Sequence, residues 1–132
     1  MDLSYLNVDL EIRSAESLAP LVAGLGDEVI VLRDDEHAGR FHASFELSQC
    51  DLGAEETILG FCDLIEGLPA GVREHWERCE RREFNLGYEL APGGPSAEVR
   101  LSELALRRMA ALGAALGFTV YDPAQIPPMP AE

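Results

Sequence analysis

The sequence predicts an α+β fold in which one mainly antiparallel sheet of five to six strands packs against three to four helices. The segments 6–13, 41–47 and 84–90 each alternate apolar and polar residues, which is typical of strands with one face in water. Between them, apolar residues recur at helical spacing. The expected order is strand, helix, strand, strand, helix, helix, strand, strand, helix and strand. We expect one domain over 1–122, followed by a Pro-rich tail, 123–132, that is extended or disordered.

The first strand is expected over 6–13, where every second residue is Leu, Val or Ile. A short helix should follow. Ser17 is its candidate N-cap, Pro20 falls in its first turn, where a missing N–H costs little, and Gly26 closes it.

Two further strands are expected to form a hairpin. The β-branched run 29–32 predicts a more buried strand. Residues 34–39 have the composition of a turn, and the alternating segment 41–47 follows directly.

The middle of the chain predicts two helices. The helix after Asp51 has one apolar stripe, formed by Ile58, Phe61, Cys62, Ile65 and Leu68. Residues 69–71 interrupt the pattern, and a second helix follows with Val72, His75, Trp76 and Cys79 on one face. If these two helices count as one, the order through residue 90 is that of a ferredoxin-like βαββαβ unit.

A second hairpin is expected in the last third, with the turn 92–95 joining strand 84–90 to a partner over 97–101. Ser102 caps an alanine-rich helix that Gly117 ends, and 118–121 forms a last short strand. The inner face of that helix is expected to contain Ala105, Met109, Leu112 and Leu116.

Charge and composition exclude several functions. With 24 acidic and 10 basic residues the net charge is −14, which repels phosphate backbones and anionic membrane surfaces, so we expect neither nucleic-acid nor membrane binding. The chain has no lysine, which excludes Walker-type phosphate loops, protein kinases and Schiff-base cofactors. No signal peptide or spanning segment is predicted, and three cysteines without a C-x-x-C pair fit a reducing compartment. We expect a cytoplasmic protein without a cofactor.

Acidic side chains are the main candidates for a binding site. Four of them fall within an arc of roughly 100° on the helix after Asp51, and no basic residue lies between Asp51 and Leu68. These four are Glu55, Glu56, Asp63 and Glu66. A second acidic patch consists of Asp34, Asp35 and Glu36. Unpaired like charge favours a basic protein partner, although the same charge could serve only solubility.

A metal-binding protein or enzyme is the first alternative. His75 and Cys79 are four residues apart on one helix face and could reach one ion, with Cys50 or His42 as a third ligand. The simpler interpretation is a buried histidine beside Trp76. No catalytic triad or nucleophile motif is found.

A homodimeric structural protein is the second alternative. Leu104, Ala111 and Ala115 form a weak apolar stripe away from the inner face of the last helix. This stripe could pack under the tail or form a dimer contact, and we expect either a monomer or a homodimer.

The hairpin 84–101, the segment 102–104 that opens the alanine-rich helix and the ending 116–122 resemble a family of small bacterial α+β domains of unknown function. Some similar domains are thought to be immunity proteins that neutralise toxins. The family's Gly- and Trp-containing segment between the early strands is missing here, and no functional residue can be carried over. The function we expect is therefore a non-catalytic protein-binding or immunity-type module that presents an acidic surface to a basic protein.

Overall fold

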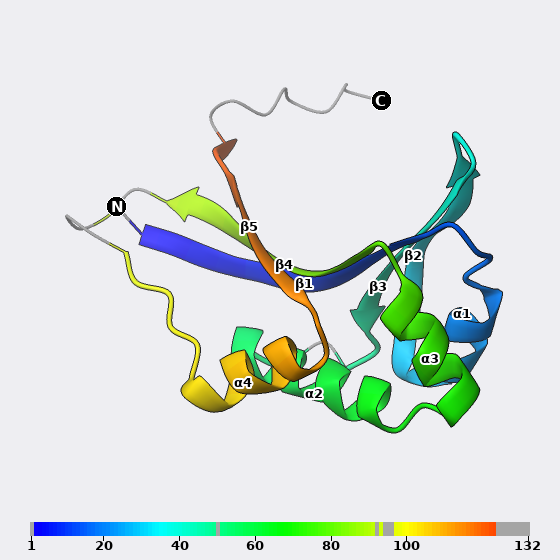
Figure 1. The fold of residues 1–132 in the computed structure, drawn as a ribbon. Coiled ribbons are helices and arrows are strands. Elements are labelled where there is room, and N and C mark those ends of the chain that lie inside the picture. The colour runs from blue at the N-terminus through cyan, green and yellow to red at the C-terminus, as the bar shows by residue number, and fades with distance from the viewer. Residues whose placement is uncertain (1, 50, 92, 94–96, 124–132) are drawn as a thin grey trace.

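A computed structural model describes residues 2–49, 51–91, 93 and 97–123. They form an α+β fold with one five-stranded mixed sheet of order β2-β3-β1-β4-β5 and four α-helices (Figure 1). The elements are β1 (Asp2–Ser14), α1 (Ala19–Leu25), a 3-10 turn (Gly26–Glu28), β2 (Val29–His37), β3 (Arg40–Leu47), α2 (Ala54–Glu66), α3 (Ala70–Arg78), β4 (Arg81–Ala91), α4 (Glu103–Ala111) and β5 (Ala115–Tyr121). No helix among the described residues is long and apolar enough to cross a membrane.

The first half of the fold follows the predicted order. β2 and β3 form the expected hairpin, but β2 continues to His37, and the turn is limited to Ala38 and Gly39, both of which have positive φ. Helix α1 has Pro20 in its first turn and is closed by Gly26 at φ 61°, as predicted. The predicted cap, Ser17, accepts a hydrogen bond from the Ala19 backbone N–H, although the helix itself begins one residue later.

The predicted second hairpin is wrong. Residues 97–101 have no regular structure, and β4 instead pairs with β5, which runs parallel to it. A parallel neighbour requires a crossover between the two strands, and the segment 97–113, which includes α4, supplies it. Val99 and Leu101 are partly buried against the core, so their alternation reflects packing of an extended segment. The predicted turn at 92–95 lies outside the described residues except for Gly93, and so does the tail beyond 123.

The last helix is shorter than predicted. Helix α4 ends at Ala111, and Gly113, at φ 69°, turns the chain into β5. Leu116 and Gly117 are therefore strand residues, and the expected end of the helix at Gly117 is wrong. Ser102 caps α4 as predicted, since its hydroxyl accepts a hydrogen bond from the Ala105 N–H at 3.1 Å.

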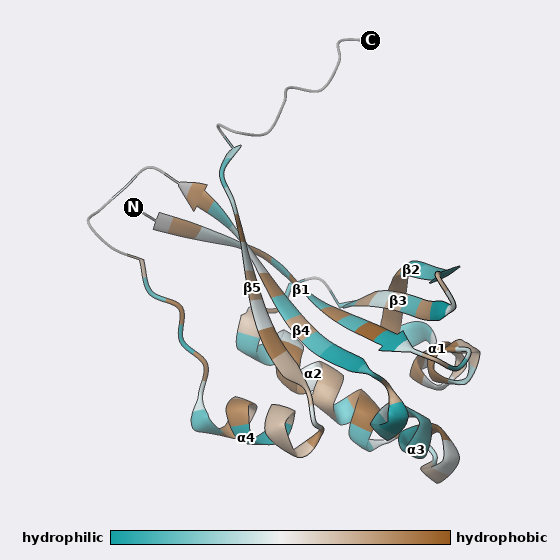
Figure 2. Cartoon of the chain, turned by 45° about the horizontal axis from the view of Figure 1, so that its top comes forward, coloured by the Kyte–Doolittle hydropathy of each residue, from teal (hydrophilic) through white to brown (hydrophobic). Residues whose placement is uncertain are grey.

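All four helices cover the same face of the sheet (Figures 1 and 2). The predicted α2 stripe is buried throughout and meets Phe45 and Phe84 from the sheet. Trp76 of α3 is fully buried, and its Nε1–H donates to the carbonyl oxygen of Leu112 at 2.9 Å, which ties α3 to the end of α4. No described helix lies over the opposite face of the sheet, here called the open face (Figure 1).

Candidate functional site

The predicted acidic residues of α2 contact α4 and the residues before it. Arg108 of α4 places Nη2 2.6 Å from Asp63 Oδ1 and 2.9 Å from Glu66 Oε1. Glu55 accepts a hydrogen bond from the Ser102 backbone N–H, and this bond lowers the pKa of the Glu55 carboxyl. Only Glu56, of these four, has no partner within the described part of the chain. The expectation that no base neutralises this arc is wrong, because Arg108, more than forty residues away in sequence, packs beside it.

The second predicted patch lies in strand β2 and not in a turn. Asp34, Asp35 and Glu36 are all exposed near the end of the hairpin. Arg33 Nε donates to Asp35 Oδ2 at 2.8 Å, and this hydrogen bond lowers the pKa of Asp35. Adjacent residues of a strand point to opposite faces, so Asp34 and Glu36 are separated from Asp35. The three carboxylates do not form one cluster.

The open face brings together carboxylates that the sequence analysis did not select. β1 and β3 are antiparallel with Leu10 opposite Phe45, so Asp9 and Glu46 are neighbours on that face. Asn7 Nδ2 donates to both of them, at 2.9 Å to Asp9 Oδ1 and 3.0 Å to Glu46 Oε1. We call Asn7, Asp9 and Glu46 the open-face cluster.

The chain supplies little positive charge to this cluster. Arg81 forms ion pairs with Glu11 at 3.3 Å and with Glu83 at 2.7 Å. Glu11 and Glu83 are opposite each other on β1 and β4, two residues along β1 from Asp9. Asp9 and Glu46 have no basic partner in the described ranges. Burial, together with the nearby carboxylates of Glu46 and Glu11, raises the pKa of Asp9 to about 6. The fold thus holds crowded like charge with one amide as its internal donor, an arrangement typical of functional sites.

Gly87 makes room for the cluster on β4. A Cβ at this position would lie 2.6 Å from Asn7 Oδ1, so a side chain here would displace the amide from the two carboxylates. A small hollow of about 110 Å³ adjoins the cluster, beyond the pair formed by Leu10 and Phe45. Asn7 and Glu46 line it together with Tyr5, Leu6 and Leu47, so acidic and apolar groups meet there.

The sequence contained a signal for this site. Asn7 and Asp9 belong to the alternating polar positions of the first predicted strand, which we interpreted as a solvated face. Strand pairing places Glu46, from a different strand, beside them. The pairing of β1 with β3 could not be predicted from the alternating pattern, so the site could not be assembled from the sequence.

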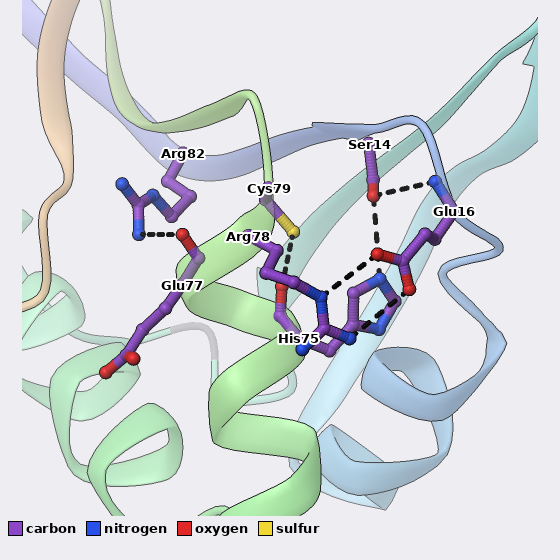
Figure 3. Close-up of polar contacts among 7 residues, drawn as sticks. All are labelled: Ser14, Glu16, His75, Glu77, Arg78, Cys79 and Arg82. Carbon is purple, nitrogen blue, oxygen red and sulfur yellow. Dashed lines mark hydrogen bonds and ion pairs between the residues drawn. The ribbon is translucent and has the colours of Figure 1, made fainter.

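His75 is a buried residue in a separate surface hollow. The residue is 4% exposed, and its Nε2 lies 3.5 Å from Ser14 Oγ, which also accepts a hydrogen bond from the Glu16 backbone N–H. Glu16 and Arg78 form a two-point ion pair beside it (Figure 3). The hollow, of about 470 Å³, lies between α1 and α3.

His75 and Cys79 do not combine into a metal site. The Cys79 thiol lies 3.3 Å from the His75 carbonyl oxygen and donates to it, and burial raises the pKa of this thiol to about 11. His42 is on β3, opposite Arg13, and Cys50 lies outside the described residues. In the part of the chain that the structure describes, no three His, Cys, Asp or Glu side chains are grouped so that they could hold an ion.

Comparisons with protein-family models, with curated proteins and with solved structures found no match for this chain. The resemblance of the segments 84–104 and 116–122 to small bacterial α+β domains therefore stays a prediction.

Proposed function

We propose that the protein is a non-catalytic protein-binding module whose open-face cluster receives a basic segment of its partner. The main support is the pair Asp9–Glu46, two adjacent carboxylates that share Asn7 as their donor and have no described basic neighbour. An arginine or lysine from outside would supply the missing positive charge. Its binding would relieve the repulsion that contributes to the raised pKa of Asp9.

The hollow beside the cluster suggests the chemistry of the segment. Its walls combine apolar surface from Leu6 and Leu47 with polar groups from Asn7 and Glu46. A segment that alternates basic and apolar residues matches this arrangement better than a uniformly basic one. The net charge of −14 would speed the encounter with such a partner at low salt.

The α2 acids support this function less well. Asp63, Glu66 and Glu55 already accept hydrogen bonds from Arg108 and Ser102, so a partner would have to compete with these internal contacts. The immunity-type role implied by the resemblance is the special case in which the bound protein is a toxin.

The proposal can be tested with a synthetic peptide of alternating arginine and valine and an NMR titration of the ¹⁵N-labelled protein. We expect the Asn7 side-chain amide and the Asp9, Glu46 and Gly87 backbone amides to shift most. Shifts confined to α2 or the β2–β3 turn, or spread evenly over the surface, would contradict the proposal.

Two double variants provide a matched comparison, since each removes two negative charges. Asp9→Asn with Glu46→Gln should weaken peptide binding and reduce its salt dependence. Asp34→Asn with Glu36→Gln should leave binding close to that of the parent. Equal losses in both would mean that net charge, and not the open-face cluster, determines binding.

A further inference from the structure

Strand β5 forms one outer edge of the sheet. It pairs with β4 without interruption from Ala115 to Tyr121, and no other described strand pairs with its outer side. Its side chains are unusually apolar for such a position, since Phe118 and Val120 are each 52% exposed. The Phe118 ring is stacked on Tyr88, with ring centroids 6.5 Å apart, so it is held against the sheet.

The opposite edge, β2, has the protection against strand pairing that β5 lacks. β2 also exposes apolar residues, at 30–32, but its pairing with β3 is irregular between Val31 and Arg33. Charged residues then occupy 33–36. Bulges and charges on an edge strand prevent another chain from extending the sheet. β5 has no charge, no proline and no register shift.

Charge also limits which partner can approach β5. Residues 109–121 contain no charged side chain, although the chain as a whole has a net charge of −14. A basic partner would gain no attraction from this strip. A second copy of the chain is repelled by most of the surface, and the uncharged strip is where two copies can meet with least repulsion.

From these three observations we infer that the protein forms a homodimer in which β5 pairs antiparallel with β5 of a second copy. A two-fold axis near Phe118, the middle residue of the strand, allows all seven residues to pair. This pairing satisfies the outward backbone groups of both strands and joins the two sheets into one.

The dimer leaves the open faces available. A two-fold axis between antiparallel neighbours in one sheet is perpendicular to that sheet, so both helix layers lie on one side and both open faces on the other. The inference does not depend on the proposed function, because β5 and the open-face cluster share no residue.

Analytical ultracentrifugation of the full chain over a range of concentrations tests the inference. We expect a reversible monomer–dimer equilibrium. Phe118→Glu, which places two carboxylates opposite each other at the two-fold axis, should raise the dimer dissociation constant by about tenfold or more. The matched control is Ile30→Glu on the β2 edge, where the parent side chain is 48% exposed, and it should leave the dimer intact.

Two further measurements distinguish loss of the interface from loss of the fold. Mixing Phe118→Glu with Phe118→Lys should restore a dimer through opposite charges. Amide hydrogen exchange of the unmodified protein should slow in β5, and not in β2, as concentration rises. A full chain that stays monomeric at all concentrations, or a dimer that Ile30→Glu disrupts as strongly as Phe118→Glu, would overturn the inference.

Discussion

Arg108 and Asp63 join the two helices that lie side by side under the sheet, with 2.6 Å between Nη2 and Oδ1. The same guanidinium also contacts Glu66, and hydrogen bonds to Glu66 and Asp63 raise the pKa of Arg108 well above its ordinary value. Two of the four acidic residues selected on α2, Asp63 and Glu66, are therefore engaged in contacts within the protein. These contacts also explain why the acids of α2 are tolerated so close together.

Replacing Arg108 with glutamine should lower the free energy of unfolding by about 1 kcal/mol, because it leaves Asp63 and Glu66 repelling each other without a partner. The difference from the parent should shrink in high salt, where exposed charges are screened. Urea denaturation at two salt concentrations measures both effects. Arg107→Gln is the control, because Arg107 contacts only Glu103 of its own helix among the ion pairs described. This substitution should lower the free energy of unfolding by less.

Asp9 should make stability depend on pH. Its pKa is about 6 in the fold against an ordinary 3.8, so the folded protein binds this proton more tightly than the unfolded chain. The contribution of this carboxyl to stability is therefore highest below about pH 4, falls as the pH rises through about 6, and stays lower above it.

Asp9→Asn should therefore raise the free energy of unfolding at pH 7 by about 1 kcal/mol, a value reduced for solvent screening of this half-exposed carboxyl. It should also flatten the stability profile between about pH 4 and 6. Thermal unfolding over this pH range provides the measurement, and the exposed Glu56→Gln serves as control. An unchanged profile in Asp9→Asn would contradict the role assigned to Asp9.

Gly113 and Gly71 should respond in opposite directions to alanine. Gly113 has φ 69°, and a Cβ there would lie 2.9 Å from Arg82 Nη2. Gly113→Ala should therefore lower the free energy of unfolding by about 1–2 kcal/mol. Gly71 lies in α3 with nothing within 4 Å of an added Cβ, and Gly71→Ala should stabilise by up to about 1 kcal/mol. Chemical denaturation of both variants checks the two signs.

Cys62 and Cys79 should react slowly with alkylating reagents in the folded protein. Both are buried, and burial raises the pKa of each thiol to about 11, so few thiolates are present at neutral pH. Mass spectrometry after iodoacetamide treatment, with and without denaturant, should show both modified only when the chain is unfolded. Rapid native modification of Cys79 would show that the thiol is more accessible than its contact with the His75 carbonyl allows.

Local periodicity identified most elements. The α2 stripe and the β2–β3 hairpin were predictable because burial repeats every 3.6 residues in a helix and every second residue in a strand. The same rule failed at Val99 and Leu101. An extended segment can alternate buried and exposed side chains without pairing with another strand. The last helix was also predicted to end at Gly117. In the structure it ends at Ala111, and Gly113 has the positive φ that follows it.

Two features of the candidate sites depend on contacts between distant segments. Asp9 and Glu46 are 37 positions apart, and they become one cluster because β1 lies between β3 and β4 in the sheet. Arg108 neutralises part of α2 because the crossover places α4 beside it. Neither contact can be predicted from the local sequence, because each joins segments that only the tertiary fold brings together.

The amino-acid order alone was sufficient for the α+β class, the amphipathic helix α2, the first hairpin and the acidic character of the surface, because each follows from local side-chain periodicity or total charge. Only the tertiary structure decided three other features. These are the direction of β5, the proximity of the Asp9 and Glu46 carboxylates, and the placement of the uncharged strand β5 at the edge of the sheet. Those properties depend on which backbones share hydrogen bonds, and that choice is made by packing of the whole core.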